Sequence, residues 1–346
     1  MESKDTSKSR VVYLDVLNIL AIIAVVAMHV NGIVHLDPMR KEWSSSLVVD
    51  CVFYFAVPVF FLISGATLMT YRERYDTKTF IKKRLVKILI PLLFWSMIML
   101  IWKVETYQLR VDDYSFRNLF DMFLNNKIEY TYYFMYDIFG IYLTIPLLSL
   151  LAKEDNKKTL WFTVVIYFIF NSFLSNILTL MGTSYNNSLT VQIGEYIIFI
   201  ILGYLLSTTD ISKKKRIALY ISAIIGVIYR YAFTYKLSKE LGYVDRTTWG
   251  YCTWHSVLLA CAVFVYFKNL KYKFSDKTLN LLKTISSCSF GIYLLHHIVM
   301  FYEIRLFNID TFSWEWRTVG ILTTYIISLI CVYMLKKISI IKKIVP

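Results

Sequence analysis

Ten stretches of mainly apolar residues follow one another along this 346-residue chain, with short polar segments between them. A helix needs about 20 apolar residues to cross a bilayer, where it satisfies its own backbone hydrogen bonds. Hydrophobic residues make up 57% of the sequence and charged residues only 18%, more apolar than a typical soluble domain. The sequence therefore predicts an all-α fold, a polytopic transmembrane helix bundle with about ten spans. We expect these spans at residues 11–34, 47–70, 86–102, 131–151, 160–181, 194–206, 217–235, 250–267, 285–307 and 318–335.

The basic residues between the spans predict which side of the membrane each segment faces. If the N-terminus is cytoplasmic, the inner segments carry 26 Lys and Arg residues and the outer segments carry 10. Basic residues accumulate in cytoplasmic loops, so both termini are expected to be cytoplasmic and the longest outer loop covers 103–129. We expect one membrane domain at 11–335, with cytoplasmic tails at 1–10 and 336–346. The first apolar run lacks a small-residue cleavage site, so we expect it to remain as a helix.

Net charge and cysteine usage exclude several classes of protein. A net charge of +14 would suggest nucleic-acid binding in a soluble protein, but here Lys and Arg form short clusters beside apolar runs. Such clusters are topology signals that lie against anionic membrane lipid, so we expect no nucleic-acid partner. The five cysteines are odd in number and widely spaced within apolar segments, which indicates neither a disulfide framework nor a metal site. The five histidines form no H-E-x-x-H run, and we expect no metal.

Ionisable residues occur inside or at the ends of the predicted spans. A charged side chain near the bilayer centre costs about 2.5–3.5 kcal/mol on insertion scales, so each needs a partner, a cavity or a function. Six of the ten lie at the depth of the outer half, which predicts an external, partly wet cavity. The ten residues are Asp15, His29, Asp50, Asp137, Glu195, Arg230, His255, His296, Glu303 and Arg305.

One face of the first span carries Asp15, Asn18, Ile22, Val25 and His29, because 11 residues make about three helical turns. This row of residues runs along the helix from the inner half of the membrane to the outer half. On this pattern alone, a single histidine on an apolar helix is more often a packing residue than a catalytic one.

Six further sequence features are segments that are spread over nearly the whole chain. They are YLDVLNILAIIAVVAMHVNG (13–32), FFLISGATLM (60–69), FIKKRLVKILIP (80–91), YFMYDIFGIYLTIP (133–146), EYIIFIILGYLL (195–206) and SFGIYLLHHIVM (289–300). In order and spacing they resemble the acyltransferase-3 family of integral membrane O-acyltransferases, which modify cell-surface polysaccharides and related envelope molecules. Two positions depart from that family. Asn18 stands where a basic residue is usual, and Lys87 replaces the later arginine of an Arg-x-x-Arg pair.

The resemblance implies transfer of an acyl group, usually acetyl, from cytoplasmic acyl-CoA to a hydroxyl of an external glycan or lipid-linked saccharide. It further implies a multi-pass protein of the bacterial cytoplasmic membrane. Arg84 and Lys87 are the candidates for binding the CoA phosphates, with Ser64 close in depth. Lys87 keeps the charge of the family's arginine but loses its planar fork. Asn18 can hydrogen-bond the thioester or a pantetheine amide.

The resemblance also implies which residues carry the chemistry. His29 is the expected general base, which removes the proton of the attacking hydroxyl or relays the acyl group covalently. Glu303 or Asp50 is expected to orient it, and the sequence leaves that choice open. His296 is either a second catalytic group or a structural hydrogen-bonding residue.

Two other classes of function are compatible with the sequence. Charged residues within spans also mark the substrate paths of transporters and polysaccharide exporters, although no internal repeat supports that reading. A purely structural membrane partner gives no reason to bury so many ionisable groups, and we consider it the weakest alternative.

Overall fold

The computed structural model describes residues 11–183, 186–339 and 341–345, and the part of the chain it describes is built from helices without strands. The expected N-terminal tail at 1–10 lies outside the described residues. The helices are α1 (Val12–Val30), α2 (Trp43–Phe53), α3 (Ala56–Leu68), α4 (Thr77–Glu105), α5 (Phe116–Leu124), α6 (Tyr133–Leu148), α7 (Lys157–Tyr167), α8 (Ser175–Leu180), α9 (Ile197–Thr208), α10 (Lys213–Leu241), α11 (Trp254–Lys268), α12 (Asp276–Leu306) and α13 (Trp314–Leu335). A π-helical segment, Phe168–Leu174, joins α7 to α8.

The prediction of a polytopic helical membrane protein is confirmed. Every predicted span coincides with helical structure, and seven helical stretches among the described residues are long and apolar enough to cross a membrane. The helices α9 and α11 are apolar but shorter, and α6 has 16 residues. Helices on the outside of the bundle expose apolar side chains, as lipid contact requires. On α10 and α13 these include Ile224, Ile225, Ile228, Leu322, Ile326 and Ile330.

The second predicted span is divided into two helices. We expected one helix over 47–70, but α2 ends at Phe53 and α3 begins at Ala56. Proline has no backbone N–H and its ring clashes with the carbonyl four residues earlier. Pro58 therefore disrupts the helix at Tyr54, and the two halves together form one candidate span.

Two other spans begin earlier than the hydropathy pattern predicts. The helix α4 starts at Thr77, because the side chain of Asp76 accepts a hydrogen bond from the backbone N–H of Thr79. This bonding holds the pKa of Asp76 below its usual range. The helix α12 starts at Asp276, where Ser275 caps it in the same way. The polar first turns of α4 carry the basic residues Arg84 and Lys87.

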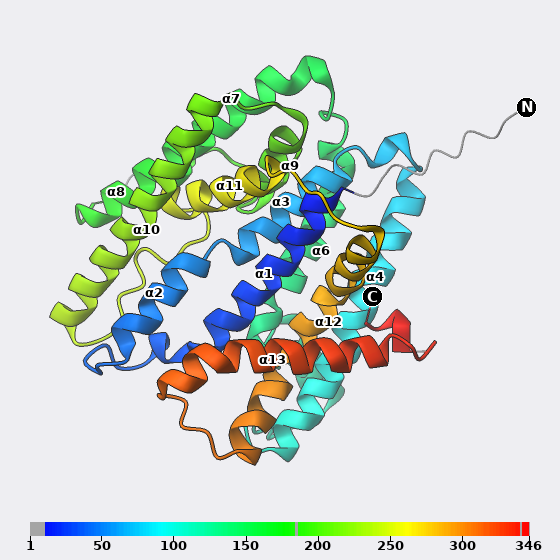
Figure 1. Ribbon diagram of the computed structural model, residues 1–346, viewed down its shortest axis with the longest axis vertical. Helices are drawn as coiled ribbons and strands as arrows, with labels where there is room; N and C mark the ends of the chain where they lie inside the picture. The colour runs from blue at the N-terminus through cyan, green and yellow to red at the C-terminus, as the bar shows by residue number, and fades with distance from the viewer. Residues whose placement is uncertain (1–10, 184–185, 340, 346) are drawn as a thin grey trace, which may run out of the picture.

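The helix α1 lies in the middle of the bundle (Figure 1), in contact with α2, α3, α11, α12 and α13. Figure 1 shows α10 and α11 on one side of it, with α12 and α13 on the other. Because neighbours surround α1, residues on most of its faces are buried. The stripe from Asp15 to His29 therefore faces the interior of the bundle.

The helices α3 and α9 approach so closely that only glycine fits at two positions. A Cβ atom on Gly65 would lie 2.1 Å from the carbonyl oxygen of Ile200, and one on Gly203 would lie 2.1 Å from that of Leu62. Small residues allow such close backbone contact between membrane helices. This contact fixes α3, which carries Ser64, against the centre of the bundle.

Candidate active site

Three histidines from two helices form a cluster. His29 lies in the last turn of α1, and His296 and His297 lie on α12. The ring centroid of His29 is 5.1 Å from that of His296 and 4.6 Å from that of His297, and the α12 pair are 4.4 Å apart. The sequence predicts roles for His29 and His296 separately, and the structure brings the two side chains together. His297 is not among the residues predicted from sequence, although its place next to His296 in SFGIYLLHHIVM is a visible signal.

The hydrogen bonds of His296 indicate its tautomer. Its Nδ1 atom lies 2.8 Å from the carbonyl oxygen of Tyr293 and 3.1 Å from that of Ile292, so Nδ1 carries the hydrogen and donates it. The Nε2 atom of a neutral imidazole then keeps a lone pair. The Nε2 atoms of His296 and His297 are buried and have no hydrogen-bond partner among the described residues. The cluster therefore offers acceptor nitrogens within the protein interior.

Ring nitrogens of the three histidines are spaced closely enough to bind a metal. One ring nitrogen from each histidine lies within 4.8 Å of the other two, and three histidines with an open fourth position form one known type of zinc site. The scattered histidines predicted no metal from sequence, and that expectation stays a prediction that chelation can test.

A cavity of about 1100 Å³ lies among α1, α3, α4, α6 and α12. Pockets of about 300–1,000 Å³ accommodate typical small ligands, so this one is large enough for an extended cosubstrate. Four of the residues expected at the donor site line it: Asn18, Ser64, Arg84 and Lys87. The structure thus places these four residues around one cavity, while their role in binding stays a prediction.

One end of the cavity is strongly basic. Arg84 and Lys87 on α4, Arg74 before that helix, and Lys336 directly after α13 all contribute to its lining. The Nε atom of Arg84 is buried without a hydrogen-bond partner among the described residues. The Nζ atom of Lys336 donates to the carbonyl oxygen of Ser287 at 2.7 Å, which holds the lysine against α12. Lys336 is the first residue of the C-terminal tail expected from sequence, and it is not among the predicted site residues.

Asn18 joins α1 to α12 beside this cavity. Its Nδ2 atom donates to the carbonyl oxygen of Ser286 at 2.8 Å and lies 3.1 Å from the Oγ atom of the same residue. An amide suits this position because it bonds neutral groups without introducing another positive charge near Lys87 and Arg84. The asparagine therefore fixes the relative position of the two helices that carry the histidines.

The opposite end of the cavity approaches the histidines. Val25 and Tyr293 line it, one on α1 and one on α12. His29 follows Val25 by four residues, and His296 follows Tyr293 by three, which is about one helical turn in each case. The cavity therefore extends from the basic cluster to within about one turn of the three imidazoles.

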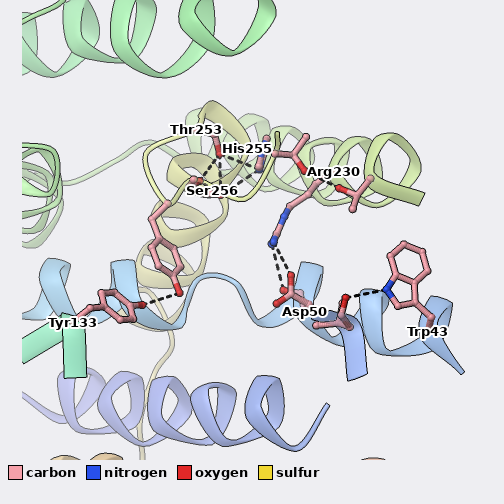
Figure 2. Close-up of polar contacts among 12 residues, drawn as sticks. Trp43, Asp50, Tyr133, Arg230, Thr253, His255 and Ser256 are labelled. Carbon is pink, nitrogen blue, oxygen red and sulfur yellow. Dashed lines mark hydrogen bonds and ion pairs between the residues drawn. The ribbon is translucent and has the colours of Figure 1, made fainter. Parts of the chain in front are cut away.

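The two acidic residues proposed to orient His29 have other partners. The Oε2 atom of Glu303 accepts a hydrogen bond from Thr324 at 2.5 Å. Asp50 on α2 forms an ion pair with Arg230 on α10 at 2.6 Å, as Figure 2 shows. The guanidinium of Arg230 also lies over the ring of Tyr54, 3.4 Å from its centroid. Asp50 thus belongs to a buried ion pair. A role for Glu303 or for Asp50 in orienting His29 stays a prediction.

A third acidic residue, which is not among the site residues predicted from sequence, directly precedes a tyrosine that packs on His297. Glu129 is 2% exposed. The residues that follow it pack on α12, where the ring of Tyr130 lies 6.1 Å from that of His297 and the hydroxyl of Tyr132 donates to the carbonyl oxygen of Leu294 at 3.1 Å. Its Oε2 atom is 2.8 Å from the Nζ atom of Lys103 near the end of α4. The sequence gives no signal for this burial, because Glu129 occurs in a polar loop where carboxylates are usually solvated.

Comparison with known proteins gives one match. The sequence model of the acyltransferase-3 family, described as an acyltransferase domain, matches residues 11–333. No curated protein and no solved structure matches the chain. The matched range includes the three histidines and most of the cavity lining, while Lys336 follows it.

Proposed function

Because this chain belongs to the acyltransferase-3 family, and is therefore a membrane acyltransferase, we propose that it transfers acetyl from cytoplasmic acetyl-CoA to a saccharide hydroxyl. The acceptor is an extracytoplasmic glycan or lipid-linked saccharide, and the membrane is the cytoplasmic membrane of a bacterium. One observation carries the proposal: a single cavity extends from a basic cluster to within about one helical turn of three histidines.

The basic end of the cavity suits the phosphates of coenzyme A. Charged donors bind phosphate oxygens more strongly than neutral ones, and an arginine can bind two oxygens at once. Arg84 supplies that fork, including the buried Nε atom without a partner. Lys87 and Lys336 supply point charges from α4 and from the end of α13.

The middle of the cavity suits the pantetheine arm, which carries amide groups between the phosphates and the sulfur. Ser64 and Asn18 line this region, and both side chains have hydrogen-bonding atoms. Apolar side chains such as Phe134 and Ile138 cover the opposite wall on α6. An extended arm anchored at the basic end would direct its thioester toward His29.

His29 acts as the general base in this proposal. Its imidazole takes the proton from the acceptor hydroxyl while the hydroxyl oxygen attacks the thioester carbonyl carbon. The carbon–sulfur bond then breaks, and the imidazolium returns the proton to the leaving thiolate. The products are the acetyl ester and free coenzyme A, so atoms and charge balance. Glu303 remains a candidate to orient the site, and His296 is the candidate second group because its Nε2 lone pair lies in the same cluster.

The experiment uses sealed membrane vesicles that contain the protein and a saccharide acceptor fraction from the cell envelope. Inside-out vesicles expose the cytoplasmic face, and we expect them to transfer label from radioactive acetyl-CoA added outside. Right-side-out vesicles should transfer none until they are permeabilised. Saccharide export without release of free coenzyme A would contradict the proposal and support the transporter alternative.

A further inference from the structure

A second pocket lies among α7, the π-helical segment, α9, α10 and α11, on the side of α1 opposite α12 and α13 (Figure 1). None of the described residues that line it also lines the cavity of the candidate active site. Its volume is about 230 Å³, and an apolar cavity of about 150 Å³ already accommodates benzene. The lining is apolar except for Ser172. The pocket is therefore suited to a hydrocarbon group.

The pocket opens on the face of α7 that contacts lipid. Val165 lines the pocket and is 49% exposed. Phe162 and Ile169, three residues before it and four after it, are also exposed, and residues at this spacing share one face of a helix. Exposed apolar side chains on a membrane helix face the acyl chains of the bilayer. An acyl chain can therefore enter the pocket from the side.

Two lysines hold the segment 206–211, whose first and last residues line the pocket. Lys268 is the last residue of α11, and its Nζ atom donates to the carbonyl oxygen of Leu206 at 2.8 Å. Lys157 is the first residue of α7, and its Nζ atom donates to the carbonyl oxygen of Thr208 at 2.9 Å. Both ammonium groups therefore lie at the same end of the pocket.

Each of these lysines keeps a donor for a ligand. An ammonium group has three N–H donors. Lys268 uses a second one on the carbonyl oxygen of Thr209 at 2.9 Å. Lys157 uses a second one on the carboxylate of Glu154 at 2.7 Å, but Glu154 is 81% exposed, and an exposed ion pair is weak. Among the described residues, these contacts leave one donor on each lysine for an anion at this end of the pocket.

The surrounding surface adds further positive charge. The segments 153–158, 207–216 and 268–273 begin or end the helices around the pocket, and they carry ten basic residues and three acidic ones. Their basic bias places them on the cytoplasmic side of the membrane. Basic pockets between membrane helices on that side bind the head groups of anionic lipids. Charge and apolar lining thus favour the same class of ligand.

We propose that this pocket binds an anionic phospholipid of the cytoplasmic leaflet, with part of an acyl chain inside it and the phosphate on Lys157 and Lys268. The chain alone cannot select one lipid, because lipid tails are as apolar as the side chains around them. The charge of the head group provides the selectivity. A lipid-linked saccharide acceptor belongs to the outer leaflet under the proposed function, so it approaches from the other side. The site is independent of acyl transfer.

The test measures bound lipid on the full chain by native mass spectrometry. Protein in detergent is mixed with equal amounts of phosphatidylglycerol and phosphatidylcholine that have identical acyl chains. We expect the wild type to retain phosphatidylglycerol over phosphatidylcholine by about 10-fold or more, because two ammonium groups act on the charged head group. Lys157→Gln with Lys268→Gln should reduce this preference to within about threefold. The control is Lys277→Gln with Lys283→Gln, two exposed lysines of α12 outside the pocket lining.

A second variant tests the chain end of the site and keeps both lysines, whose hydrogen bonds also support the fold. Val165→Trp adds bulk at the opening and should lower retention of phosphatidylglycerol by about 10-fold. Its control is Ile224→Trp on α10, at an exposed position that does not line the pocket. The thermal midpoint in detergent shows that each variant is folded, and added phosphatidylglycerol should raise it for the wild type more than for Val165→Trp.

Three results would overturn the proposal. Equal retention of the two lipids by the wild type would mean that the pocket takes any acyl chain. Unchanged retention by folded Val165→Trp would place the bound lipid elsewhere on the protein. Displacement of the lipid by an equal concentration of glycerophosphoglycerol, which has no acyl chains, would make the ligand a soluble phosphate. Because these measurements follow bound lipid, they stand whether or not the protein transfers acetyl.

Discussion

The imidazole rings of His29 and His296 lie 5.1 Å apart, although they come from opposite ends of the chain. The contact between α1 and α12 that brings them together is also fixed near the start of α1 by the hydrogen bond from Asn18 to Ser286. The two helices thus connect the basic end of the cavity to the histidine cluster. A change at either end can be tested for its separate effect on cosubstrate binding or on the chemical step.

Removing charge at the basic end should weaken binding of acetyl-CoA. The double variant Arg84→Gln with Lys87→Gln is expected to raise KM for acetyl-CoA by about 10-fold or more, because each charged donor to a phosphate contributes about 1.5–3 kcal/mol. The value of kcat at saturation should change less. The matched control is Lys78→Gln with Lys82→Gln, two exposed lysines of α4 outside the cavity lining. An unchanged KM in the first variant would remove both residues from the donor site.

A methyl group between α3 and α9 should destabilise the protein. Gly203→Ala places a Cβ atom 2.1 Å from the carbonyl oxygen of Leu62, so the helices must separate. Overpacking of this kind typically costs about 1–3 kcal/mol. We expect a lower thermal midpoint in detergent than for Gly140→Ala, a helical control whose added Cβ would have no neighbour within 4 Å. Equal midpoints for the two variants would contradict the close contact.

Breaking the ion pair between Asp50 and Arg230 (Figure 2) should lower the stability of the folded protein rather than the rate of the chemical step. Asp50→Ala leaves Arg230, which is 1% exposed, with an uncompensated charge. Loss of one partner of a buried pair costs about 3–5 kcal/mol. We expect low abundance of Asp50→Ala and partial recovery in Asp50→Asn with Arg230→Gln, measured by detergent extraction and thermal midpoint. A stable Asp50→Ala protein with low kcat would instead make Asp50 part of the reaction site.

Chelation distinguishes a general base from a metal ligand set. If the histidines act as bases, o-phenanthroline or EDTA should leave the rate of acetyl transfer unchanged, and the purified protein should hold no stoichiometric metal. Loss of activity on chelation, with recovery on adding zinc, would show that the three nitrogens spaced within 4.8 Å bind an ion.

Residue patterns predicted the membrane fold well because apolar length is a direct requirement of the bilayer. The break between α2 and α3 also had a local signal in Pro58, which the hydropathy reading did not use. The stripe from Asn18 to His29 followed from helical periodicity alone. These features are determined by residues that are close together in the sequence, so the sequence alone can predict them.

Contacts between distant helices could not be predicted in this way. The position of His297 beside His29 depends on the relative rotation of α1 and α12, which the hydropathy pattern does not contain. Glu129 is buried because the residues that follow it pack on α12 and because Lys103, near the end of α4, pairs with its carboxylate. A polar loop sequence normally predicts solvation, so tertiary structure alone reveals this residue.

The most direct test of the account is the rate of acetyl transfer by His29→Gln. We would measure label from radioactive acetyl-CoA in the saccharide fraction, with wild type and variant in nanodiscs at equal amounts of folded protein. Loss of a general base typically lowers a rate by about 10²–10⁴-fold, so the account predicts a fall in kcat of at least 10²-fold with a nearly unchanged KM for acetyl-CoA. A His29→Gln protein that transfers acetyl within about threefold of the wild-type rate would contradict it.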